Sequence, residues 1–109
     1  MPGKEIPLMI TYLKKELKRT LGESIRDIIL FGSQAENKAH KDSDFDVLII
    51  LNSECDKNSR DIILAVIYNI ELEHDIFIDF KIISTHELKN TLRGKQPIFT
   101  NAIQSGLYV

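Results

Sequence analysis

The sequence has few of the residues that hold small secreted or membrane-bound domains together. Its 109 residues include no tryptophan and only one cysteine. Because Cys55 has no second cysteine to pair with, no internal disulfide can form. No apolar run reaches the roughly 18 residues that a membrane-spanning helix needs, and the stretch after Met1 lacks the apolar core of a signal peptide. These absences exclude a disulfide-stapled scaffold and predict a cytoplasmic protein with no membrane partner.

A basic excess is missing as well. The formal net charge is −2, whereas binding to a nucleic-acid backbone depends on several Lys or Arg contacts. We therefore expect no strong nucleic-acid binding. One dense basic cluster exists, and it comprises Lys14, Lys15, Lys18 and Arg19. It has two interpretations, a solvated helix face or a docking surface for an acidic partner.

Length and apolar content predict a single domain over residues 1–109, because 109 residues that are 43% hydrophobic suffice for one core. Periodicity and turn residues predict the elements. They are a helix at 6–21, strands at 25–31, 44–51 and 76–84, helices at 60–73 and 97–104, a short helix after Ser84, and a terminal strand or docked tail at 107–109. Their order predicts an α/β (α+β) fold, a small mixed sheet of three to four strands with helices packed on it.

Two of these helices carry recognisable start signals. Asn58 or Ser59 is the expected N-cap of the helix at 60–73. Ser84 and Glu87 have the spacing of a capping box, which predicts that a helix begins directly after Ser84.

Asp44 and Asp46 open an otherwise apolar strand. Side chains alternate along a strand, so both carboxylates belong to one face, with Cα atoms about 7 Å apart. Two such charges repel each other unless a cation lies between them. Mg²⁺ prefers one or two carboxylates together with substrate phosphates. The alternative is a solvated strand entry without a ligand.

Gly32 and Ser33 follow the first strand directly. A glycine lets the backbone turn tightly and approach a ligand. Free backbone N–H groups at such a turn suit a phosphate. Taken alone, the pair also fits an ordinary turn.

A third carboxylate, Asp79, lies in the apolar middle of the strand at 76–84. Charged residues are rare in such places unless they are paired or functional. The structural alternatives are an ion pair with Lys81 and an edge strand that faces water. If this strand neighbours the one at 44–51, three carboxylates converge in the outline of a two-metal phosphoryl-transfer site.

The spacing of these residues resembles the signature of the DNA polymerase beta-like nucleotidyltransferases. Gly32-Ser33 is followed after ten residues by Asp44-Phe45-Asp46, and Asp79 comes later between hydrophobic residues. The stretch from Phe31 to Val47 is most similar to the minimal nucleotidyltransferases, which are often encoded beside a HEPN-domain partner. The segment at 103–108 also resembles their tail.

The resemblance implies roles for five residues. Gly32 and Ser33 would hold the β- and γ-phosphates of a nucleoside triphosphate, ATP. Asp44 and Asp46 would ligate two Mg²⁺ ions. Asp79 would ligate the catalytic ion and help to activate the acceptor hydroxyl. The implied reaction is metal-dependent transfer of AMP to a hydroxyl, a tyrosine of a HEPN toxin, with the present chain as the antitoxin. A chain this short would borrow surface from that partner or from a second copy, as a hetero-oligomer or a homodimer.

The sequence departs from the family pattern after the glycine. Family members commonly carry arginines two and four places later and then a glycine, and this chain has Gln34, Glu36 and Asn37. Candidate substitutes for the missing positive charge are Lys38, Lys41, Lys81 and Arg93. The departure favours an alternative function, a non-catalytic or weakly catalytic antitoxin that neutralises its partner by complex formation.

Overall fold

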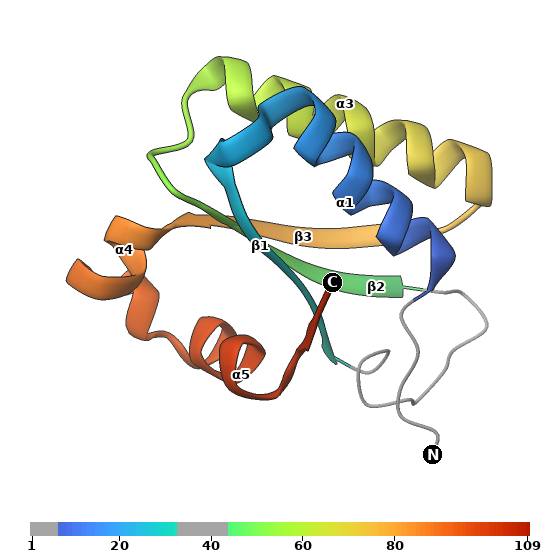
Figure 1. Ribbon diagram of the computed structural model, residues 1–109. Coiled ribbons are helices and arrows are strands. Elements are labelled where there is room, and N and C mark those ends of the chain that lie inside the picture. Colours follow the sequence, from blue (N-terminus) through green and yellow to red (C-terminus); the bar gives the residue numbers. More distant parts are fainter. Residues whose placement is uncertain (1–6, 33–43) are drawn as a thin grey trace.

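A computed structural model describes residues 7–32 and 44–109 of the chain (Figure 1). Its centre is a four-stranded sheet in the order β3-β2-β1-β4. Strand β1 is antiparallel to β2 and β4, whereas β2 and β3 are parallel. The strands are β1 (Ile25–Phe31), β2 (Asp44–Leu51), β3 (Phe77–Ser84) and β4 (Leu107–Tyr108). The predicted mixed sheet with packed helices is therefore confirmed, and the segment after Gly106 forms a short terminal strand.

Helices α1 (Leu8–Leu21) and α3 (Lys57–His74) cover one face of the sheet, the upper face in Figure 1. Because β2 and β3 are parallel, the chain must cross over between them, and α3 makes that crossing. Both helices bury an apolar stripe at helical spacing against the strands. The buried stripes are Ile10, Leu13 and Leu17 on α1, and Ile63, Ile67 and Ile70 on α3.

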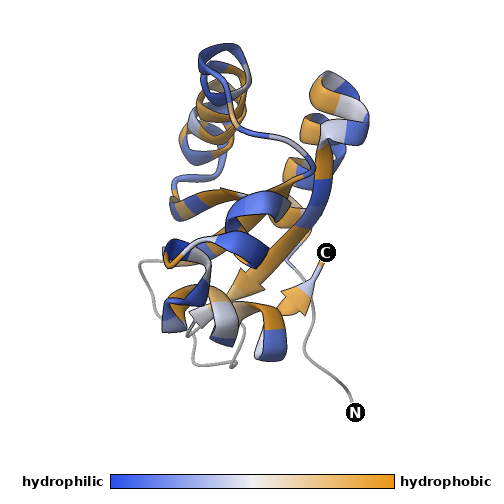
Figure 2. Ribbon diagram, turned by 90° about the vertical axis from the view of Figure 1, so that its left-hand side faces the viewer, coloured by the Kyte–Doolittle hydropathy of each residue, from blue (hydrophilic) through white to orange (hydrophobic). Residues whose placement is uncertain are grey.

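Helix α5 (Pro97–Ser105) packs on the opposite face of the sheet and follows the short helices α4 (Thr85–Asn90) and η2 (Arg93–Lys95) along the chain. The contact is a second, smaller core, which consists of Ile29, Leu48, Ile50, Ile83, Phe99 and Ala102. Figure 2 shows the same layering by hydropathy, with mainly apolar strands between helices of mixed polarity. On this face the apolar contact covers the middle of β1 and the second halves of β2 and β3.

Of the two predicted helix caps, the one at the start of α4 agrees with the structure and the one at the start of α3 does not. The capping box is confirmed, since Ser84 Oγ accepts a hydrogen bond from Glu87 N and Ser84 N donates to the Glu87 carboxylate. The N-cap predicted for α3 is wrong, because Asp56 caps the helix and its carboxylate accepts from Ser59 N at 2.7 Å. An ionised cap is favoured at the positive end of the helix dipole, so α3 begins earlier than expected.

Candidate functional site

Asp46 and Asp79 are paired in register across the parallel strands β2 and β3. Paired residues of neighbouring strands project from the same face of a sheet, and here it is the face that also carries α5. Asp44 lies two positions earlier in β2, opposite Phe77. The topology thus brings the backbone positions of the three predicted carboxylates together in the first halves of β2 and β3.

Asp79 faces water and has a cationic neighbour. Its side chain is 67% exposed, and Lys81 Nζ lies 3.2 Å from Asp79 Oδ1. β3 is also an edge strand among the described strands. Both features of the structural alternative are therefore present, and they explain how a carboxylate is tolerated in this strand. Neither feature removes Asp79 from its position beside Asp46.

Gly32, which directly follows β1, lies against the Asp46 member of this pair. Its φ is +78°, and a Cβ atom at this position would collide with Asp46 Oδ2. Only glycine satisfies both conditions, because it has no Cβ and tolerates positive φ. The backbone at the end of β1 therefore lies directly against the Asp46 carboxylate. Ser33, the other predicted phosphate-binding residue, lies outside the described residues.

The donor chemistry of this site fits a hard divalent cation. Within residues 7–32 and 44–109, no cluster of three or more His, Cys, Asp or Glu side chains is placed to hold a metal. Two carboxylates in register, Asp46 and Asp79, come from neighbouring strands. A Mg²⁺ site of one or two carboxylates completed by substrate phosphates requires no more than this from the protein.

A family comparison identifies the chain. The model of the nucleotidyltransferase domain matches residues 10–99, which include Gly32, both Asp44 and Asp46, and Asp79. The chain belongs to the nucleotidyltransferase domain family. A search of curated proteins found no match.

Solved structures share the fold of this nucleotidyltransferase domain at low sequence identity. A toxin–antitoxin complex with AMP-PNP matches with a TM-score of 0.55 and 17% identity, over 89% of this chain and 69% of the other. A mutant of the toxin–antitoxin MntA-HpeT matches with a TM-score of 0.58 and 18% identity, over 96% and 72%. The toxin–antitoxin MntA-HepT matches with a TM-score of 0.51 and 17% identity, over 93% and 68%.

Arg93 has a structural role in this domain. Its guanidinium donates to Glu87 Oε2 at 3.1 Å and to the Ile82 carbonyl at 3.0 Å, and it stacks on the Phe99 ring at 5.0 Å. These contacts join η2 and α5 to β3. Lys81 remains the candidate substitute beside the carboxylates. The other candidates, Lys38 and Lys41, lie outside the described residues, as do Gln34, Glu36 and Asn37.

The basic cluster of α1 is largely engaged within the chain. Lys14 Nζ donates to the Val109 carbonyl at 2.6 Å and Lys18 Nζ to the Ile25 carbonyl at 3.0 Å. Arg19 pairs with Glu16 at 2.8 Å. These contacts tie α1 to β1 and to the last residue of the chain, and they weaken the interpretation of the cluster as a docking surface. None of the described helices combines the length and the apolar character that crossing a bilayer takes.

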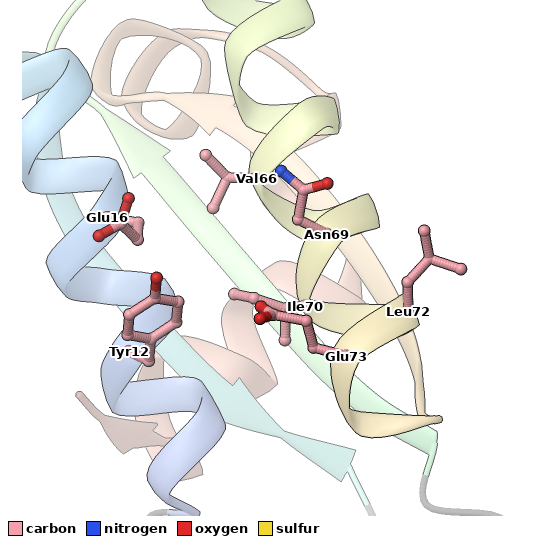
Figure 3. A pocket seen from close by; sticks show the side chains of 7 residues that line it. All are labelled: Tyr12, Glu16, Val66, Asn69, Ile70, Leu72 and Glu73. Carbon is pink, nitrogen blue, oxygen red and sulfur yellow. The ribbon is translucent and has the colours of Figure 1, made fainter.

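A cavity of about 400 Å³ lies away from the carboxylates. It opens between α1 and α3, where Tyr12 and Glu16 of α1 face residues of α3 (Figure 3). These helices cover the face of the sheet opposite to Asp46 and Asp79, so this cavity does not serve that site. A second cavity, of about 350 Å³, reaches Gly32 itself and includes Asn101 and Ser105 of α5. No sequence motif pointed to these two residues, because α5 meets β1 only in the folded chain.

Proposed function

We propose that this domain is a metal-dependent nucleotidyltransferase that transfers AMP from ATP to a hydroxyl group of a HEPN toxin, with a tyrosine as the acceptor. The observation that carries the proposal is the register of Asp46 with Asp79 beside Gly32. A carboxylate pair next to a backbone turn combines a cation site with a phosphate site. Membership of the nucleotidyltransferase family supports the reaction class.

Asp44, Asp46 and Asp79 are the residues that would hold two Mg²⁺ ions. When bound, the ions neutralise phosphate charge and favour the attacking form of the acceptor oxygen. Gly32 and Ser33 would hold the β- and γ-phosphates through backbone N–H groups and the serine hydroxyl. The missing side chain of Gly32 lets the triphosphate approach the backbone closely.

The reaction needs positioning more than covalent chemistry from the protein. The acceptor oxygen attacks the α-phosphorus and forms a new P–O bond. The bond between the α-phosphorus and the bridging oxygen to the β-phosphate breaks, and pyrophosphate leaves with that electron pair. Asp79 takes the proton of the acceptor hydroxyl as a general base. Its exposure at the edge strand leaves the carboxylate accessible to a hydroxyl on another protein, and Lys81 holds it in place.

A toxin partner is supported by the printed descriptions of three structural neighbours, which are toxin–antitoxin complexes. One of them contains AMP-PNP, an ATP analogue. The short chain would complete its acceptor site with the partner's surface in a hetero-oligomer in the cytoplasm. The formal net charge of −2 favours a protein acceptor over free nucleic acid.

The test is co-expression of the chain with a HEPN-domain protein encoded beside it, followed by mass spectrometry of the complex. We expect the partner to gain the mass of one or more AMP units. The variant with Asp44→Asn and Asp46→Asn should bind the partner and add no mass. Asp61→Asn is the matched control, because it makes the same change on α3, away from the site, and should preserve transfer.

Two results would contradict parts of the proposal. A stable complex without mass gain from the wild type would favour an antitoxin that acts by covering its partner. Transfer of AMP to a small molecule, with no complex formed, would retain the chemistry and overturn the toxin–antitoxin role.

A further inference from the structure

A second cavity adjoins the carboxylate site along one row of the sheet. Phe31 of β1 pairs with Asp46 of β2, which pairs with Asp79 of β3. The three side chains therefore lie in one line across the same face. At the Phe31 end, beyond Gly32, the cavity of about 350 Å³ opens between β1 and α5. Gly32 lines this cavity and also touches Asp46, so it connects the two places.

The walls of this cavity are uncharged. Its lining is Phe31, Gly32, Ile98, Asn101, Ala102, Ser105 and Gly106. Among the described residues that line it, there is no Lys, Arg or His to attract a phosphate, and no Asp or Glu to attract a cation. Apolar walls with a few polar groups at the rim suit a flat heterocycle, which is apolar on its faces and polar at its edge.

We infer that this cavity binds the nucleobase of the nucleoside triphosphate and that Asn101 determines the choice of base. The inference rests on the proposed function, because it assumes that the phosphates bind at Gly32 and the carboxylates. The cavity volume lies near the lower end of the range of ligand sites, which suits a base better than a whole nucleotide. Phe31 offers its ring as a stacking surface next to the phosphate site.

Asn101 provides the selectivity. Its side chain is exposed on α5 and makes no hydrogen bond to any described residue, so its amide is available to a ligand. A side-chain amide offers one donor group beside one acceptor. Adenine presents the complementary acceptor and donor, N7 and the N6 amino group, on one edge. Guanine presents two acceptors there. Asn101 therefore favours ATP over GTP.

Calorimetry with the full chain and Mg²⁺ tests the inference, with ATP, GTP and inorganic tripolyphosphate as probes. Tripolyphosphate reports the phosphate site alone. We expect ATP to bind about tenfold more tightly than tripolyphosphate, which corresponds to one or two good base contacts. Ser105→Phe fills the cavity from an exposed position and should reduce ATP binding to the level of tripolyphosphate. Asn101→Ala should reduce the preference for ATP over GTP about tenfold.

Gln104→Phe is the matched control for Ser105→Phe. Gln104 is the preceding residue of α5, is exposed, and does not line the cavity, so this variant should bind all three probes like the wild type. If tripolyphosphate binds but ATP binds no more tightly, or if Ser105→Phe leaves ATP binding unchanged, the base site is overturned and the proposed function stands. If none of the probes binds, the proposed function fails and the base site with it.

Discussion

Asp46 and Asp79 lie directly opposite each other on β2 and β3, the parallel pair of this sheet. Parallel pairing needs a crossover, and α3 supplies it on the face away from both carboxylates. The connection between the two strands therefore does not cover the site. This arrangement leaves the two acids on the sheet face opposite to α1 and α3.

The double change of Asp44→Asn and Asp46→Asn should abolish AMP transfer and preserve the fold. Neighbouring carboxylates repel each other when no cation is bound, so we expect the unfolding temperature of the metal-free protein to stay the same or rise. Thermal unfolding and transfer of labelled AMP measure the two effects. A loss of folding would mean that the acids are structural. Asp61→Asn should leave transfer intact.

Gly32→Ala should weaken metal-dependent ATP binding severely. The new Cβ would collide with the Asp46 carboxylate, and alanine at a φ of +78° is strained. Gly22→Ala is a useful comparison, because Gly22 also has a positive φ, +58°, but has open space around its Cα. Backbone strain should lower the free energy of unfolding of each variant by on the order of 1–3 kcal/mol. Gly32→Ala should lose more than Gly22→Ala, because its Cβ also collides with Asp46.

Binding separates the two glycines more clearly than stability does. At a temperature where both variants are folded, Gly22→Ala should bind ATP like the wild type in calorimetry. Normal ATP binding by Gly32→Ala would show that the contact between Gly32 and Asp46 has no part in the site.

The sequence predicted the elements of this fold well because the apolar periods are regular. Ile63, Val66, Ile67 and Ile70 have the spacing of one helical face, which predicts a helix at 60–73 despite the continuous apolar run there, and α3 occupies this segment. The sequence alone could not establish the register of Asp46 with Asp79, because the pairing of distant strands depends on how α3 packs. The choice of Asp56 as N-cap was missed, because Asn58 and Ser59 are also good caps and only the folded backbone distinguishes them.

The cavity beside Gly32 shows where sequence reasoning stops. Phe31 and Asn101 are far apart along the chain and come together only when α5 folds back onto β1. Neither residue belongs to a motif, and an exposed asparagine on a helix carries no signal by itself. Arg93 is a similar case, since its contacts with Glu87, Ile82 and Phe99 depend on tertiary packing.

Arg93→Ala should destabilise the fold without changing ATP binding by the folded protein. The guanidinium makes two hydrogen bonds and a stacking contact, and its side chain is 41% exposed. Allowing for that exposure, we expect a loss of about 1 kcal/mol in the free energy of unfolding. Urea unfolding measures this loss, and Lys95→Ala, an exposed cation on the same short helix, should cost little. If Arg93→Ala weakened ATP binding while stability stayed constant, Arg93 would be a phosphate ligand.

The contribution of Asp56 to stability should disappear in acid. The hydrogen bond from Ser59 N lowers the pKa of Asp56 below its ordinary value of 3.8. A group with a lowered pKa in the folded state stabilises the fold at pH values above its unfolded pKa, and this effect is lost as the pH falls through the folded pKa. Asp56→Ala should therefore unfold at a lower temperature than the wild type at neutral pH, and the difference should shrink below pH 3.8. Asp56→Asn is the control, because asparagine caps a helix without titrating. Its advantage over Asp56→Ala should persist in acid, and if it too vanished there, the acid sensitivity would belong to other carboxylates.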